Sequence, residues 1–228
     1  EAAWRENNLG VALLEQFRFA DAVGAFGRAL EKDPSLLAAR INLAIAQLYV
    51  PDIPAAKQSA EEALKAAPLA PQPNYLLALI ARSEGRAEDA VPYVRKVLAA
   101  DPKDLGANVT LGQVHLQMRQ FEGAAAAFRV ALAAEPYNVS AAYNLGVALT
   151  RAGKREEGQE AMAAFQKLRD SAYKSALGSN YLEQGKYAEA LASTGAEPEA
   201  VDARTPAVSF AGKDEALAGA STLVLADV

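Results

Sequence analysis

The sequence predicts an all-α protein made of antiparallel helix pairs stacked one on the next. Prolines recur at intervals of 34 residues, and a small residue preceded by Leu recurs at the same interval. Two independent series with one period of this length are typical of an array in which a single helix pair repeats. The prolines are Pro34, Pro68, Pro102 and Pro136, and the small residues are Gly10, Ala44, Ala78, Gly112 and Gly146.

Each period contains the residues that a packed helix pair needs. A second small residue follows the first by twelve positions, as in Ala22 and Ala90, and small side chains allow two helices to approach closely. Bulky residues such as Phe26 and Phe128 follow at helical spacing and fill the space beside them. Proline then ends the unit, because it disfavours helix in the preceding residue and lacks a backbone donor.

The repeats divide the chain into an array over 1–194 and a tail over 195–228. Five repeats span about 3–36, 37–70, 71–104, 105–138 and 139–170, and a sixth, irregular repeat is expected from residue 171. In the sixth, Leu177 and Gly178 lie only 32 residues after the preceding Leu-Gly pair, so the register shifts. Within the units, Gly85, Gly153 and Gly185 suit turns between helices, and Pro51 to Pro54 break the second unit.

These residues together resemble the tetratricopeptide repeat family, which has the same period and the same Leu-Gly/Ala, Ala, Phe, Ala and Pro signature. The resemblance implies a right-handed α-α superhelix, followed here by a short irregular C-terminal tail. It also implies a non-catalytic scaffold that binds a protein or peptide partner on a concave groove lined by the first helix of each repeat.

Composition excludes several other classes of function. The net charge of -5 and the absence of a basic run argue against nucleic acid as a partner. The chain has no cysteine, and no run of 18 apolar residues that would insert into a membrane. His115 is the only histidine, so a zinc site is not expected, and adjacent carboxylates such as Glu61 and Glu62 diverge on a helix. We therefore expect no enzyme activity, no metal and no cofactor.

Candidate partner-binding residues lie at fixed offsets from the small residue of each first helix. Two positions before it, Asn stands in three of the repeats, as Asn8, Asn42 and Asn144, which is part of the Asn ladder seen in family members that hold extended peptides. An amide can both donate to and accept from a peptide backbone. Alternatively, these Asn residues only solvate the groove. Tyrosines three positions before it suit an interface, but if buried they belong to the core. The predicted groove residues are Asn8, Asn42, Tyr49, Tyr75, Arg82, Gln113, Tyr143, Asn144 and Arg151.

A clamp for C-terminal carboxylates, known in some family members, is not expected. The matching positions lack the required cations; they hold Asn7, Val11, Asn42, Gln72 and Leu76, or Val109, Gln113, Asn144, Ala172 and Ala176.

The tail predicts a linker and the start of a following β domain. Residues 205–210 and 223–228 resemble the lead-in to the FG-GAP repeats that some bacterial proteins join to a tetratricopeptide array. Two alternative functions stay open. The first helix, with Trp4, begins without an obvious polar cap, which leaves a self-assembling structural scaffold open. The tail leaves open the non-catalytic arm of a larger FG-GAP surface protein. The FG-GAP resemblance would favour an extracytoplasmic location, but the sequence leaves the compartment and any homo-oligomer undetermined.

Overall fold

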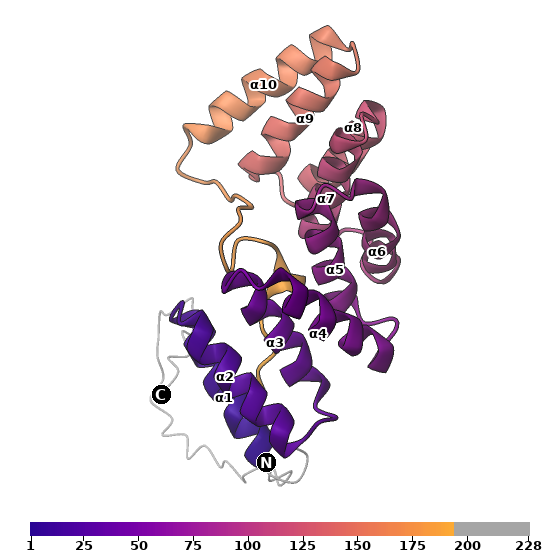
Figure 1. The fold of residues 1–228 in the computed structure, drawn as a ribbon. Coiled ribbons are helices and arrows are strands. Elements are labelled where there is room, and N and C mark those ends of the chain that lie inside the picture. The colour runs from indigo at the N-terminus through magenta and orange to yellow at the C-terminus, as the bar shows by residue number, and fades with distance from the viewer. Residues whose placement is uncertain (194–228) are drawn as a thin grey trace, which may run out of the picture. The chain divides into compact units, whose positions relative to one another are not determined.

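A computed structural model describes residues 1–193 of the chain, which form one compact unit. This part contains ten α-helices arranged as five pairs (Figure 1). Each helix packs against its partner and against the next helix along the chain. The pairs are α1 (Ala2–Glu15) with α2 (Phe19–Lys32), α3 (Leu37–Tyr49) with α4 (Ile53–Ala66), α5 (Pro71–Ser83) with α6 (Ala87–Ala100), α7 (Leu105–Gln117) with α8 (Phe121–Ala134), and α9 (Val139–Arg151) with α10 (Arg155–Arg169).

The small residues lie where the two helices of a pair cross. A Cβ atom added at Gly112 would lie 2.5 Å from the ring of Phe128, and one added at Gly146 would lie 2.5 Å from the sulfur of Met162. In the second helices, Ala22 is fully buried, as are its counterparts in the next three repeats. The periodic alternation of small and bulky residues therefore reflects close helix crossing in each pair.

The turns between paired helices also recur with the period of the repeat. A left-handed backbone (positive φ) occurs at Phe17, Gly85, Arg119 and Gly153, each a multiple of 34 residues from the others. The equivalent position in the second repeat is Pro51, whose ring excludes positive φ, and that turn is built differently. There Asp52 accepts a hydrogen bond from the N–H of Ala55 at 3.1 Å and caps α4.

Residues 171–193, which we call the return segment, differ from the expected sixth repeat. This segment contains one three-residue 3-10 helix, Lys186–Ala188, and no α-helix. Gly178, Ser179 and Asn180 form a run of turn-favouring residues where a first helix would have to continue, which explains why the Leu-Gly signature does not produce a helix here. Figure 1 shows the segment leaving α10 and running back past α7 and α5 toward α3.

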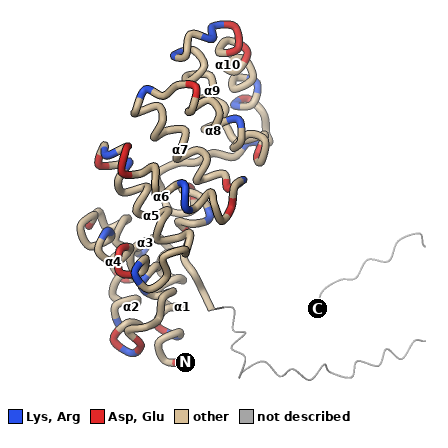
Figure 2. The backbone as a smooth tube through the Cα atoms, turned by 90° about the vertical axis from the view of Figure 1, so that its right-hand side faces the viewer, with Lys and Arg blue, Asp and Glu red and all other residues tan. Residues whose placement is uncertain are grey.

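Charged residues of both signs alternate along the described helix pairs, without a basic band (Figure 2). Within residues 1–193, no helix combines the length and the hydropathy that crossing a bilayer requires. The expected linker, the strand at 221–228 and the stretch resembling FG-GAP repeats lie outside the described residues.

Candidate functional site

The first helices α1, α3, α5, α7 and α9 form one face of the array, which we call the first-helix face. The return segment lies along this face and contacts it from the fifth repeat back to the first. The chain therefore places a stretch of its own backbone where the sequence predicts a partner to bind.

The return segment first contacts the fifth repeat. Ser175 forms a parallel β-bridge with Asn138: its carbonyl accepts from Val139 N–H at 2.9 Å, and its N–H donates to the carbonyl of Tyr137 at 3.0 Å. The hydroxyl of Ser140 then donates to the carbonyl of Leu177 at 2.9 Å and accepts from its N–H at 3.0 Å. The fifth repeat thus bonds to backbone groups of the return segment at Ser175 and Leu177.

Tyr75 on α5 contacts the middle of the return segment. Its hydroxyl donates to the carbonyl of Gln184 at 2.5 Å and lies 3.3 Å from the hydroxyl of Thr110. Backbones approach closely at this point, because a Cβ atom at Gly106 would lie 3.2 Å from the Cα of Gly185. Two glycines thus allow the segment to lie against the start of α7.

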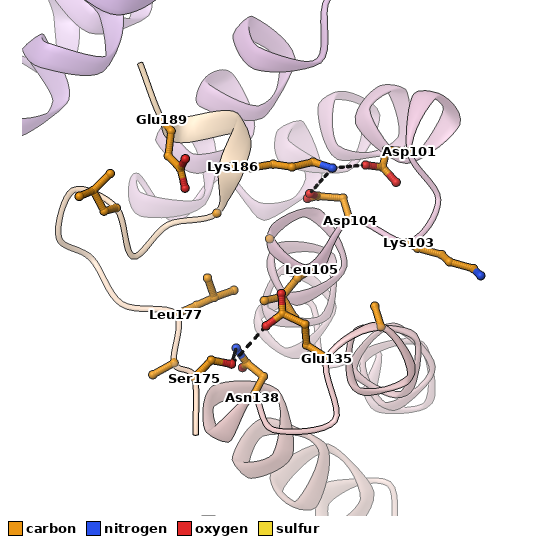
Figure 3. Close-up of a pocket in the computed structure, with 15 residues that line it drawn as sticks. Asp101, Lys103, Asp104, Leu105, Glu135, Asn138, Ser175, Leu177, Lys186 and Glu189 are labelled. Carbon is orange, nitrogen blue, oxygen red and sulfur yellow. Dashed lines mark hydrogen bonds and ion pairs between the residues drawn. The ribbon is translucent and has the colours of Figure 1, made fainter. Parts of the chain in front are cut away.

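A cationic side chain of the return segment meets two carboxylates of the array at the start of α7. The Lys186 ammonium lies 2.5 Å from Asp101 and 3.7 Å from Asp104 (Figure 3). Tyr187 also donates from its hydroxyl to Asp101, at 3.2 Å. Asp104 is 6% exposed and accepts from the N–H of Ala107 at 2.7 Å, so its carboxylate is fixed as the cap of α7.

The end of the return segment is held by asparagines of the first two repeats. The carbonyl of Leu191 accepts from Asn42 at 2.7 Å and from Asn7 at 3.0 Å, while its N–H donates to Asn42 at 2.7 Å. Asn8 accepts from the N–H of Ser193 at 2.9 Å. Asn42 and Asn7 are fully buried and joined by a 2.8 Å hydrogen bond, so they form a fixed clamp.

An aromatic cluster receives Tyr181 of the return segment. Phe19 and Tyr49 stack with ring centroids 5.1 Å apart. The Tyr181 ring packs edge-on against both, at 6.4 and 5.5 Å, and is only 3% exposed. Edge-to-face contacts of this kind stabilise aromatic groups beyond the area that they bury.

Burial and ion pairing shift several pKa values on this face. Burial raises the pKa of Tyr75 to about 12 and also raises that of Tyr49. Burial lowers the pKa of Arg82. The hydrogen bond from Lys186 holds the pKa of Asp101 below its usual value, whereas desolvation raises that of Asp104. The two carboxylates thus differ in environment, although both face one cation.

The predicted groove residues fall into two groups. Asn8, Asn42, Tyr49 and Tyr75 contact the return segment directly. Two further residues line a cavity of about 30 Å³ beside Gln184; these are Arg82 and Gln113.

The other three predicted residues, all in the fifth repeat, have different neighbours. Tyr143 is 46% exposed and packs against Phe165, with centroids 5.3 Å apart. Asn144 donates to the carbonyl of Ser140 on its own helix at 2.8 Å, and Arg151 is exposed.

Sequence reasoning did not predict several residues that contact the return segment. Ser140 has no counterpart in the other repeats, and Phe19 recurs only as Phe121, three periods later, so neither position marks a site. Asp101 precedes Pro102 and Asn7 fills one position of a carboxylate clamp that lacks its cations, so neither residue by itself marks a contact with the return segment. Asp104 had a usable signal, since Asp before a helix is a frequent cap.

Histidine and acidic side chains are the candidates for metal binding or catalysis in the described part of the chain. His115 donates one hydrogen bond, from Nδ1–H to the side-chain oxygen of Gln120 at 2.6 Å. No cluster of three or more metal-ligating side chains occurs among residues 1–193.

A cavity of about 510 Å³ lies between the return segment and the connections before α7 and α9, as Figure 3 shows. Its lining residues include Asp101, Asp104, Glu135, Asn138, Ser175 and Lys186.

Comparison with protein families finds two tetratricopeptide-repeat models that match the chain. One matches residues 7–50, 41–104 and 109–176, and the other matches residues 81–130. A comparison with curated protein sequences finds no match.

Solved structures with the same fold include those of proteins named MamA and YrrB. MamA (residues 41 to the end) from Desulfovibrio magneticus RS-1 is 20% identical, with a TM-score of 0.68 over 74% of this chain and 97% of that one. Another MamA crystal structure is 17% identical, with a TM-score of 0.65 over 74% and 92%. YrrB, described as a TPR protein with an unusual peptide-binding site, is 20% identical, with a TM-score of 0.62 over 73% and 86%. At these identities the likeness shows the fold, and it confirms the expected all-α superhelix.

Proposed function

The chain belongs to the tetratricopeptide repeat family, and we propose that it is a non-catalytic scaffold that holds an extended peptide along its first-helix face. Arrays of this family are generally scaffolds for protein–protein interaction. The observation that carries the finer proposal is the contact between Asn42 and both backbone groups of Leu191. An amide that pairs with the N–H and the carbonyl of one residue grips an extended chain whatever its side chain.

Burial of the clamp supports the same proposal. Asn7 and Asn42 have no exposed surface, and a buried amide needs hydrogen-bond partners to offset its desolvation. The return segment supplies these partners through Leu191. A partner peptide on this face would have to supply the same backbone groups.

The test uses the whole chain with a protease recognition sequence inserted between Tyr173 and Lys174. Tyr173 is 80% exposed, so the protein can fold with the return segment in place and then be cut. A fluorescent synthetic peptide of residues 175–193 is then titrated into the cut protein and followed by fluorescence polarisation. We expect saturable binding that the substitution Asn42→Ala weakens and that Asn144→Ala leaves unchanged.

Asn144 is the matched control, because it has the same position in its repeat but bonds to its own helix. Absence of peptide binding to the cut protein, or equal effects of the two substitutions, would overturn the proposal. Two alternatives stay predictions. Light scattering on the purified chain tests self-assembly, and the encoded sequence after Val228 tests whether the chain is an arm of a larger FG-GAP protein.

A further inference from the structure

The return segment shows which side chains the first-helix face can select. We propose that the partner of this face is a peptide that carries an aromatic residue in a turn and, five residues later, a cationic residue, and that it binds by displacing residues 175–193. This inference rests on the proposed function, because it specifies the peptide which that function requires. Tyr181 and Lys186 of the return segment occupy the two selective sites.

The aromatic site is built from residues of the array. Phe19 begins α2 and Tyr49 ends α3, and their rings stack on each other at 5.1 Å. Tyr181 is buried against this pair to 3% exposure. A side chain without a ring would leave the two aromatic faces without that edge-on contact, so an aromatic residue is the fitting occupant.

The cationic site is likewise built from the array. Asp101 ends the second helix of the third repeat, and Asp104 caps α7 three residues later. Both carboxylates lie within 4 Å of the Lys186 ammonium, at 2.5 and 3.7 Å. A neutral or anionic residue at this place would leave two neighbouring carboxylates, one of them 6% exposed, without a counter-charge.

The remaining contacts do not depend on side-chain identity in the peptide. Ser140, Tyr75 and Asn42 bond to the backbone of Leu177, Gln184 and Leu191. These hydrogen bonds form with any peptide backbone that follows the same path, whatever its side chains. Selectivity therefore falls to the aromatic and cationic sites, while the backbone contacts add affinity.

The covalent link makes the return segment a competitor for any such partner. It is joined to α10 by a few exposed residues, so its effective concentration at the face is high, on the order of millimolar for a short linker. An external peptide binds to the face only if its concentration and affinity together overcome this effective concentration of the return segment. The uncut protein should consequently bind the labelled peptide of residues 175–193 at least about tenfold more weakly than the cut protein.

The experiment compares peptides as competitors for the labelled native peptide on the cut protein. The unlabelled native peptide, the Tyr181→Ala peptide and the Lys186→Glu peptide are titrated in turn. We expect each substitution to weaken competition by about tenfold or more. A charge exchange is the sharpest arm, because the Lys186→Glu peptide should recover affinity on a protein carrying Asp101→Lys.

Each outcome has a distinct meaning. If the labelled native peptide binds but all three competitors are equal, the aromatic and cationic selection is overturned while the peptide-binding function stands. If the labelled native peptide does not bind, the proposed function itself fails. If cut and uncut proteins bind equally, displacement is overturned. If the uncut protein is instead a dimer that Lys186→Glu dissociates, the occupant is a second copy of this chain, which also overturns the proposal.

Discussion

Asn42 pairs with Leu191 through both of its side-chain polar groups, donating to the carbonyl and accepting from the N–H at 2.7 Å each. The two residues are 149 positions apart in the chain. The contact joins the second repeat to the end of the return segment. It shows that a first-helix asparagine of this array can grip an extended backbone.

The first prediction concerns Asn42 and the stability of the folded chain. Asn42→Ala removes the hydrogen bonds to Leu191 and the one to Asn7, whose buried side-chain oxygen then lacks its donor. We expect the free energy of unfolding in urea to fall by about 1 to 3 kcal/mol. Asn144→Ala removes only a bond within its own helix and should change it by less than about 1 kcal/mol. Equal losses would show that the Leu191 contact contributes nothing.

The second prediction concerns Tyr181 and access to the return segment. Lys186 provides a trypsin site within the segment, and cleavage there requires local release from the array. Replacing Tyr181 by Ala removes a nearly buried ring from its contacts with Phe19 and Tyr49. We expect cleavage after Lys186 to become about tenfold faster or more.

Tyr173→Ala is the control for this measurement. Tyr173 belongs to the same segment but is 80% exposed, so its loss should leave the cleavage rate unchanged. A Tyr181→Ala protein cleaved at the native rate would show that the aromatic cluster does not hold the segment.

The third prediction concerns pH and the ion pair of Asp101. The hydrogen bond from Lys186 lowers the pKa of Asp101, and Asp104 and Tyr187 face the same group. A carboxylate whose pKa is lowered by its partner stabilises the bound state fully at pH values above the unperturbed pKa of Asp, about 3.9. This contribution is lost as the pH falls through the lowered pKa. Binding of the labelled peptide to the cut protein should therefore weaken below about pH 4.

Asp101→Asn separates this ion pair from general acid unfolding. The variant should bind more weakly at neutral pH and lose less affinity on acidification. Circular dichroism at each pH identifies the range in which the helices stay intact. Parallel pH profiles for the native protein and the variant would contradict the assignment.

The fourth prediction concerns the turn at Arg119. This residue adopts a φ of 56°, which costs a non-glycine residue conformational energy, whereas Gly85 and Gly153 occupy the same position in their repeats. Arg119→Gly should raise the free energy of unfolding by about 0.5 to 1 kcal/mol. Gly153→Ala should lower it by about 1 kcal/mol, although a Cβ there would meet no atom within 4 Å. Urea unfolding measures both changes, and changes of opposite sign in the free energy of unfolding for the two variants would support this explanation.

The helix pairs could be predicted from the sequence because they are local and periodic. Each crossing needs a missing side chain on one helix and a bulky one on the other, as at Gly112 and Phe128, and both return at a fixed interval. A turn without glycine, such as that at Phe17, was not predicted, because no single residue type signals it. The neighbouring helices force the left-handed backbone there.

The return segment could not be predicted, because its contacts are distant in sequence and it carries part of the repeat signature. Tyr75 and Tyr143 show the consequence. They occupy equivalent positions in two repeats, yet one is 1% and the other 46% exposed. Only Tyr75 bonds to the return segment, at Gln184. The repeat pattern predicts the same role for both tyrosines. Their burial and contacts differ because the return segment, which is distant in sequence, passes over Tyr75.

Amide hydrogen exchange of the native, uncut chain at low protein concentration tests the occupied face most directly. The N–H groups of Leu177, Leu191 and Ser193 donate to side chains of the first-helix face, so they should exchange about ten- to a hundredfold more slowly than in the free peptide of residues 175–193. Asn42→Ala should abolish the protection at Leu191. Exchange of these three amides at the rate of the free peptide would contradict the binding of the return segment to this face.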